Sequence, residues 1–150
     1  KLDDFETIGF LSYRADRCRN FPGADMGLDE DMVDIIHQRY TSNFVAGTKS
    51  PLSSTGTPTA YGEFVAIKEA CDFVYGSREL SDKKIAIQGL GHVGYPLAEY
   101  LLNDGASLIV TDISLDTVQT LQQKYGRDLV KYVPPDDIYE VDAYFLLGCF

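Results

Sequence analysis

The sequence of 150 residues is poor in basic residues, has few cysteines and contains no long apolar run. With 13 lysines and arginines against 23 acidic residues, the net charge is −10. This balance argues against a nucleic acid or an anionic membrane surface as a partner. No apolar stretch approaches the roughly 20 residues that a membrane-spanning helix needs. We therefore expect no nucleic-acid partner and no membrane partner.

The three cysteines, Cys18, Cys71 and Cys149, are odd in number and lack the spacing of a metal site. We expect buried free thiols in a reducing compartment, the cytoplasm, and no bound metal. No signal peptide is visible, but the sequence begins at Lys1 without a methionine, so the cytoplasmic location is an inference.

The most specific pattern is glycine-rich and lies between two apolar runs. The residues GLGHVG at 89–94 have the spacing Gly-x-Gly-x-x-Gly. An apolar run at 85–87 precedes them, a helical pattern follows, and a second apolar run at 108–110 leads to Asp112. Strand, glycine turn, helix, strand and terminal acid together are typical of a Rossmann-type dinucleotide-binding unit.

Each glycine has its own physical role in such a unit. Gly89 allows the strand to turn sharply, because a glycine has no Cβ to oppose a positive φ. Gly91 leaves space for a pyrophosphate close to the main chain, and Gly94 allows the helix to pack closely on the strands. His92 and Val93 lie just before the first helical turn, whose free N–H groups face the phosphates. We predict that all five residues bind a nicotinamide dinucleotide.

Asp112 indicates which dinucleotide is bound. Its carboxylate can accept hydrogen bonds from the adenosine ribose, each contributing about 1.5–3 kcal/mol. The same charge repels a 2′-phosphate by about 4 kcal/mol per unit charge, at about 4 Å and a dielectric constant of about 20. The next residues, Ile113, Ser114 and Leu115, include no compensating arginine or lysine. We therefore expect NAD and not NADP, with Ile113 also at the cofactor. The alternative is that Asp112 is an ordinary helix cap or turn residue.

The remaining pattern predicts an α/β fold, a doubly wound parallel sheet of Rossmann type with about four strands in the order 3-2-1-4. The last strand would be an apolar edge without a neighbour, which favours aggregation in a complete protein. We therefore expect this chain to be part of a longer protein.

Before the sheet, residues 41–58 are rich in Ser, Thr, Gly and Pro and are predicted to be a domain boundary or an active-site loop. Helices are expected over 29–40, about 59–75 and 114–125. The second has a broad apolar face that includes Val65, Cys71 and Val74, and Ser114 caps the third. Strands are expected over 129–133 and 142–147, and a turn or short helix over 134–139.

Four stretches resemble the dehydrogenases of glutamate, leucine, phenylalanine and valine, most of all the leucine and phenylalanine branch. They are PGADMG at 22–27, SSTGTPTAYG at 53–62, IAIQGLGHVGYPLAEYLLNDGASLIVTDI at 85–113 and DDIYEVDAYF at 136–145. Their order and spacing are similar to those of the family over roughly residues 20–145. The resemblance implies that residues 1–56 end a substrate or catalytic domain. Residues 57–150 would then be an NAD-binding Rossmann domain, incomplete at its C-terminal end.

The resemblance implies NAD-dependent oxidative deamination of an L-amino acid to a 2-oxo acid and ammonia, by a homo-oligomer. A hydride passes from the substrate Cα to the nicotinamide, and water attacks the resulting imine. In this family a lysine of lowered pKa is the general base, and an aspartate that matches Asp25 relays protons. Such general acid–base catalysis increases the reaction rate by a factor of about 10²–10⁴. By its sequence alone, Asp25 in a glycine-flanked loop is a turn residue.

Two further residues match family positions. Thr59 matches the threonine that meets the nicotinamide amide at the start of a Thr-Ala-Tyr-Gly helix. Its alternative role is a helix N-cap, and the two roles could coexist. His92 stands where the family usually has asparagine. We expect it either to donate to a phosphate or ribose or to be a neutral ring facing solvent.

The family's catalytic and carboxylate-binding lysines lie upstream of this sequence, and Lys49 and Lys68 are expected to be solvated or loop lysines. At the end, FLLGCF at 145–150 replaces a small, proline-containing stretch that lines the nicotinamide ribose in the family. Residues that would choose among leucine, phenylalanine and valine lie mostly outside the sequence. Two other functions therefore stay open: a module that binds NAD(H) without hydride transfer, and a biosynthetic relative that couples a 2-oxo acid instead of releasing it.

Overall fold

The computed structural model describes residues 30–39 and 54–148, which belong to two compact units divided between Thr55 and Gly56. The described part of the first unit is centred on the helix α2 (Glu30–Arg39), so the helix expected over 29–40 is confirmed. Asp25, Lys49, Cys18 and Cys149 lie outside the described residues. The roles of the two units, as the end of a substrate domain and an NAD-binding domain, stay predictions.

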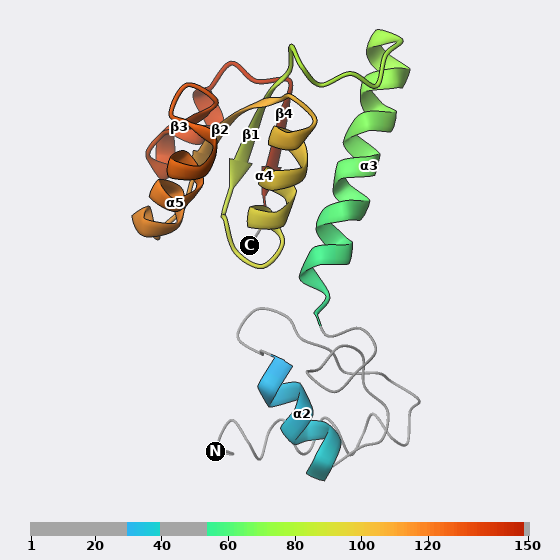
Figure 1. The fold of residues 1–150 in the computed structure, drawn as a ribbon, viewed down its shortest axis with the longest axis vertical. Coiled ribbons are helices and arrows are strands. Elements are labelled where there is room, and N and C mark those ends of the chain that lie inside the picture. Colours follow the sequence, from blue (N-terminus) through green and yellow to red (C-terminus); the bar gives the residue numbers. More distant parts are fainter. Residues whose placement is uncertain (1–29, 40–53, 149–150) are drawn as a thin grey trace. The chain divides into compact units, whose positions relative to one another are not determined.

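The second unit is built on a parallel sheet (Figure 1), whose order in the described residues is β3-β2-β1-β4. All three neighbouring pairs are parallel, so both the predicted strand order and the Rossmann-type α/β class are confirmed. The last strand begins three residues later than expected. The strands are β1 (Lys84–Gln88), β2 (Ser107–Thr111), β3 (Val130–Tyr132) and β4 (Phe145–Gly148).

Helices cover both faces of the sheet. Ile85 and Ile87 belong to the main hydrophobic core together with buried residues of three α-helices. Ala86 points to the opposite face, where it packs with Ile109 and with Ile138 of a 3₁₀-helix. This alternation is the period of two that a strand imposes. The helices are α3 (Gly56–Tyr75), α4 (Gly94–Asn103), α5 (Leu115–Tyr125) and the 3₁₀-helix η1 (Pro135–Glu140).

The helix α3 begins at Gly56, three residues before its predicted start at Thr59. A Cβ on Gly56 would lie 2.4 Å from the backbone oxygen of His92, so only a glycine allows this close contact. The pattern missed this turn because Gly56 and Pro58 are loop signals in a sequence. The contact fixes the start of α3 against the loop that precedes α4.

The interior of α3 corrects two more predictions. Val65 and Val74, which were expected on its apolar face, are 38% and 61% exposed, whereas Cys71 is buried as a free thiol. Burial raises the pKa of that thiol. Lys68 is not a solvated lysine, because its Nζ lies 2.6 Å from Asp104 Oδ2. This ion pair links α3 to the end of α4.

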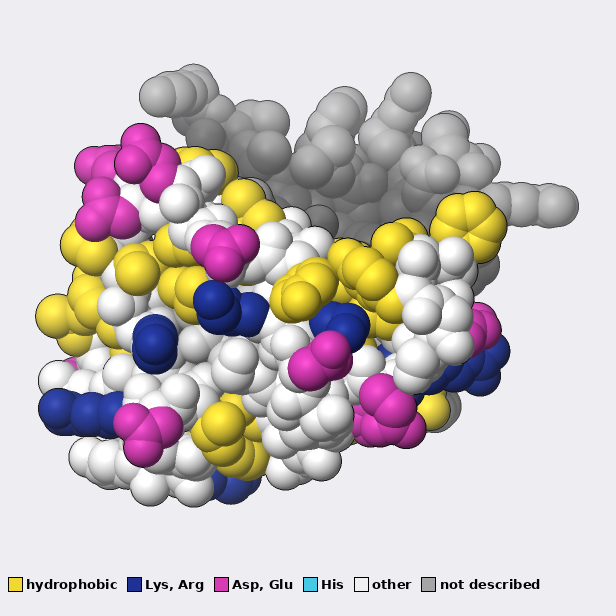
Figure 2. Space-filling view, turned by 90° about the horizontal axis from the view of Figure 1, so that it is seen from above, with side chains coloured by type: hydrophobic (Ala, Val, Ile, Leu, Met, Phe, Trp, Pro, Cys, Tyr) yellow, Lys and Arg dark blue, Asp and Glu magenta, His cyan; other side chains and the backbone are white. Residues whose placement is uncertain are grey.

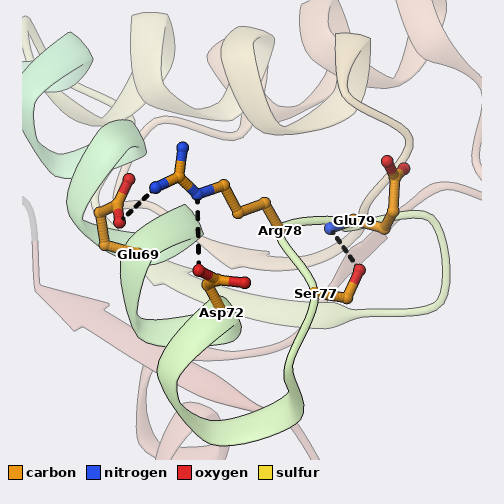
Figure 3. Close-up of polar contacts among 5 residues, drawn as sticks. All are labelled: Glu69, Asp72, Ser77, Arg78 and Glu79. Atoms are coloured by element: carbon orange, nitrogen blue, oxygen red, sulfur yellow. Dashed lines mark hydrogen bonds and ion pairs between the residues drawn. The ribbon is translucent and has the colours of Figure 1, made fainter.

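The C-terminal end of α3 carries a group of polar contacts (Figure 3). Arg78 Nη2 donates to Glu69 Oε2 at 2.7 Å, and Arg78 Nε lies 3.8 Å from Asp72 Oδ2. Just beyond the helix, Ser77 Oγ accepts the Glu79 N–H at 3.2 Å. These side chains are exposed, and exposed ion pairs contribute only about 0–1 kcal/mol each. They shape the turn into β1 more than they stabilise the fold.

At the start of β1, Lys83 is buried between two aromatic rings. Its Nζ lies 5.0 Å from the ring centroid of Tyr75 and 5.1 Å from that of Tyr144, and it donates to Asp82 Oδ1. This bond lowers the pKa of Asp82 and raises the pKa of Lys83.

Figure 2 shows the surface seen from above the view of Figure 1, where acidic, basic and hydrophobic side chains are interspersed. Within the described residues, no helix has the length and apolar character that crossing a membrane requires.

Candidate functional site

The glycine turn, residues 89–93, joins β1 to α4 at the carboxyl edge of the sheet. Gly89 has a φ of +93°, a conformation that strains any residue with a Cβ. Its N–H donates to the Thr111 carbonyl at 2.8 Å. The turn is therefore held against the end of β2, as expected for a dinucleotide-binding unit.

The helix α4 begins at the buried Gly94, and no side chain in the described part of the chain caps it. Val93 occupies the N-cap position without capping the helix through its side chain. The Tyr95 N–H donates to the Gly91 carbonyl and the Leu97 N–H to the Val93 carbonyl, both at 3.1 Å. The positive end of the helix dipole is thus not neutralised by a side chain and can receive an anion.

Gly91 is exposed, and a Cβ placed on it would meet no described atom within 4 Å. It is also absent from the described glycines with a positive φ. Neither conformation nor packing within the second unit therefore requires a glycine at this position. A ligand that lies against the main chain would require one.

Asp112 directly follows β2 and is bound to the glycine turn. One carboxylate oxygen accepts the Leu90 N–H, and the other accepts the Ser114 N–H at 2.7 Å. The second bond is the local turn that the alternative interpretation of Asp112 expected. Each carboxylate oxygen has two lone pairs, so both can still accept a hydroxyl of a ligand. The turn role and the predicted ribose contact are therefore compatible.

A cavity of about 470 Å³ lies between the glycine turn and the end of β2. It is lined by residues 89–91 of the turn but not by His92 or Val93, and by Asp112, Ile113, the start of α5 and Pro135. Its volume falls within the range of about 300–1,000 Å³ that is usual for small-molecule sites. The Ile113 side chain is 99% exposed on this wall and offers an apolar surface to a ligand.

The start of α5 differs from its prediction in detail. Ser114 occupies the N-cap position, but its side chain makes no capping bond to the helix backbone. Its Oγ accepts the Thr117 hydroxyl at 3.0 Å instead, while its N–H donates to Asp112 Oδ1. The carboxylate thus supports both the glycine turn and the entry into α5.

The structure brings most of the predicted cofactor residues together around the glycine turn. Thr59, the fourth residue of α3, is exposed and is not an N-cap, so that alternative is wrong. It lies one helical turn from Gly56, which contacts His92. The His92 residue itself is exposed, while Asp25 lies outside the described residues. The cofactor roles of these residues stay predictions.

Among the residues of the cavity wall that sequence reasoning missed are Gln88 and Thr111. They end β1 and β2 and are register partners. The available signal was a polar residue at the last position of each of two neighbouring apolar strands.

No protein-family model matches the sequence. Among curated proteins, the chain is 36% identical over 134 residues to a leucine dehydrogenase of Thermoactinomyces intermedius. It is 40% identical over 137 residues to a phenylalanine dehydrogenase of Lysinibacillus sphaericus. Each match covers 87% of this chain and 35% of the relative. The chain therefore spans about a third of the length of these relatives.

Solved structures agree with this comparison. An L-tryptophan dehydrogenase from Nostoc punctiforme superposes with a TM-score of 0.69 at 25% identity, covering 97% of this chain and 40% of that protein. A glutamate dehydrogenase from Thermus thermophilus has a TM-score of 0.64 at 18% identity, over 99% of this chain and 42% of that one, and supports the fold alone. Over the segment that it covers, the chain is thus a homologue of the leucine and phenylalanine dehydrogenases.

Proposed function

We propose that the protein is an NAD-dependent dehydrogenase of L-amino acids, which forms a 2-oxo acid and ammonia, and that this chain carries the cofactor half of the site. The matched relatives are named as leucine and phenylalanine dehydrogenases. The observation that carries the proposal is the Asp112 carboxylate, which is bonded to the Leu90 N–H beside an uncapped helix terminus. This arrangement places a hydroxyl acceptor next to a phosphate site.

The described residues fit NAD from its pyrophosphate to its adenosine. The open space above Gly91 and the uncapped start of α4 suit the pyrophosphate. The remaining lone pairs of Asp112 suit the ribose hydroxyls, and the exposed Ile113 offers an apolar surface to the base. No lysine or arginine lines the cavity in the described part of the chain, which favours NAD over NADP.

When bound, NAD supplies the acceptor for the hydride of the amino acid. The chain's own contribution at the nicotinamide end would be Thr59, whose hydroxyl binds the carboxamide. The contact between Gly56 and His92 supports this role, because it holds the first turn of α3 against the glycine turn. For His92 we propose a contact to phosphate or ribose, and for Asp25 a proton relay. Resemblance to the family supports the role of Asp25.

We also propose an apolar L-amino acid as the substrate, since the relatives are named for leucine and phenylalanine. A homo-oligomer is proposed from the same resemblance. The cytoplasm is the proposed location, which the buried free thiol of Cys71 supports.

The test of the cofactor site is Asp112→Ala, measured by calorimetry with NAD and NADP. We expect NAD binding to weaken by about 1.5–3 kcal/mol, because charge-assisted bonds to the ribose are lost. The difference in affinity between NAD and NADP should decrease as well. Asp116→Ala, in the exposed first turn of α5, is the matched control and should leave NAD binding unchanged. Equal NAD affinity in Asp112→Ala and wild type would show that this carboxylate does not contact the ribose.

This chain alone is not expected to be competent, so turnover is tested separately on the full-length protein, with NAD and with leucine, phenylalanine or valine. We expect reduction of NAD together with release of ammonia. Tight NAD binding without any turnover would instead favour a non-catalytic module. A coupled product in place of ammonia would favour the biosynthetic alternative.

A further inference from the structure

Thr111, the last residue of β2, has a buried hydroxyl without a hydrogen-bond partner in the described part of the chain. The residue is 1% exposed and lines the cavity beside Asp112. We propose that the Thr111 hydroxyl is a further cofactor-binding group, which hydrogen-bonds the adenosine half of the dinucleotide. This inference rests on the proposed function.

An unpartnered hydroxyl in the interior is unfavourable, because it has lost its water without gaining a protein partner. A valine of similar shape at position 111 would avoid this loss. A ligand atom at the cavity wall would restore the missing bond. Since a hydroxyl both donates and accepts, Thr111 suits either a ribose hydroxyl or a ring nitrogen of the base.

The neighbouring strand adds a second polar group at the same level. Gln88 is the register partner of Thr111 and lines the same cavity. Both side chains project to the face of Ala86 and Ile109, because strand residues two positions apart share a face. From η1 on that face, the Tyr139 hydroxyl donates to Gln88 Oε1 at 2.9 Å.

The bond from Tyr139 orients the amide of Gln88, since it occupies the oxygen and leaves the amide N–H groups as donors. Thr111 and Gln88, register partners on neighbouring strands, therefore give the cavity wall on this face a hydroxyl and an amide. Both residues end strands whose carboxyl ends form the edge where ligands bind in open α/β sheets. Thr111 directly precedes Asp112, and this position assigns it to the adenosine half.

The experiment is Thr111→Val in the full chain, with binding measured by calorimetry and unfolding measured without ligand. We expect the affinity for NAD and for ADP-ribose to fall by about 3- to 10-fold, the loss of one neutral hydrogen bond. Nicotinamide mononucleotide, which lacks the adenosine half, should bind as before. The thermal midpoint of the free protein should not fall, because the variant loses no internal bond.

Two further variants complete the test. Thr111→Ser keeps the hydroxyl and should keep an affinity close to wild type. Thr120→Val is the matched control, because the Thr120 hydroxyl already donates to the Asp116 carbonyl at 2.8 Å and lies outside the cavity. It should leave the NAD affinity unchanged.

Unchanged NAD affinity in Thr111→Val would overturn the inference and leave the proposed function standing. A lower midpoint in the free variant would also overturn it, since the hydroxyl would then serve the fold. Absence of NAD and ADP-ribose binding by the wild type would remove the proposed function and this inference together.

Discussion

Asp112 shows how one side chain can serve the fold and a ligand together. Its two oxygens accept the N–H groups of Leu90 and Ser114, so the carboxylate is fixed before any cofactor arrives. A group that is already oriented loses little conformational entropy on binding. The two hydrogen bonds that fix Asp112 therefore favour the ribose contact that we propose.

Gly91→Ala tests whether a ligand explains this glycine. The free protein should unfold as the wild type does, because no described atom lies within 4 Å of the added Cβ. NAD binding should weaken by about 1–3 kcal/mol, the usual cost of an extra methyl group in packed space. The control is Gly62→Ala, where the Cβ also meets nothing and an alanine in the helix should stabilise by about 0.5–1 kcal/mol. Full NAD affinity in Gly91→Ala would remove the proposed close approach of the pyrophosphate.

At this scale the sequence predicted the positions of the glycines and of Asp112, because their spacing follows from strand and helix geometry. It did not predict the unpartnered hydroxyl of Thr111. A threonine at the end of an apolar run looks like any strand residue, and the bonds that it lacks depend on its neighbours in the fold. The same holds for Gln88, whose partner Tyr139 lies 51 positions away in the sequence.

At the scale of elements, most helices and strands follow from apolar periodicity, and the errors lie at their ends. The start of α3 was placed too late because the reason for a glycine there, the backbone of His92, is distant in sequence. The prediction for Lys68 is wrong for the same reason, since its partner Asp104 directly follows another helix, α4. Local patterns contain no information about such contacts between elements.

The pair of Asp82 and Lys83 predicts a pH effect on the packing of α3, β1 and β4. Lys83 lowers the pKa of Asp82, so the pair stabilises the fold above the ordinary value of 3.8 and loses this effect as the pH falls through the lowered pKa. Lys83 has a raised pKa, so its contribution is complete below 10.5 and is lost as the pH rises through the raised value. Asp82→Asn should therefore lower the urea midpoint of unfolding at neutral pH. In acid, the midpoints of the variant and the wild type should become equal.

The control for this effect is Asp128→Asn, a change in the exposed turn before β3. Urea unfolding of the three proteins across the acid range gives the comparison. A difference between Asp82→Asn and wild type that stays constant into acid would contradict an ionic role for the pair.

At the scale of the whole molecule, the described sheet ends at β4, which pairs with β1 on one side. Leu146 on this strand is 46% exposed. An apolar edge strand with unpaired backbone groups is a template for pairing with other chains. This arrangement is the one that the sequence predicted, down to the strand order.

Leu146→Lys should therefore reduce self-association of the 150-residue chain, because a charge at a sheet edge opposes further pairing. Light scattering at increasing protein concentration measures the effect. Leu129→Lys, at an exposed position before β3, is the control for added charge alone. Equal scattering by Leu146→Lys and the wild type would show that association proceeds through another surface.

The close approach of Gly56 to the His92 backbone has a consequence beyond the start of one helix. Gly56 is the residue at which the second unit begins, and it directly follows Thr55. The covalent link between the units is thus fastened to the loop that would cradle the phosphates. Because a Cβ at residue 56 would overlap the His92 carbonyl, this link and the loop that we propose to bind the phosphates hold each other in place.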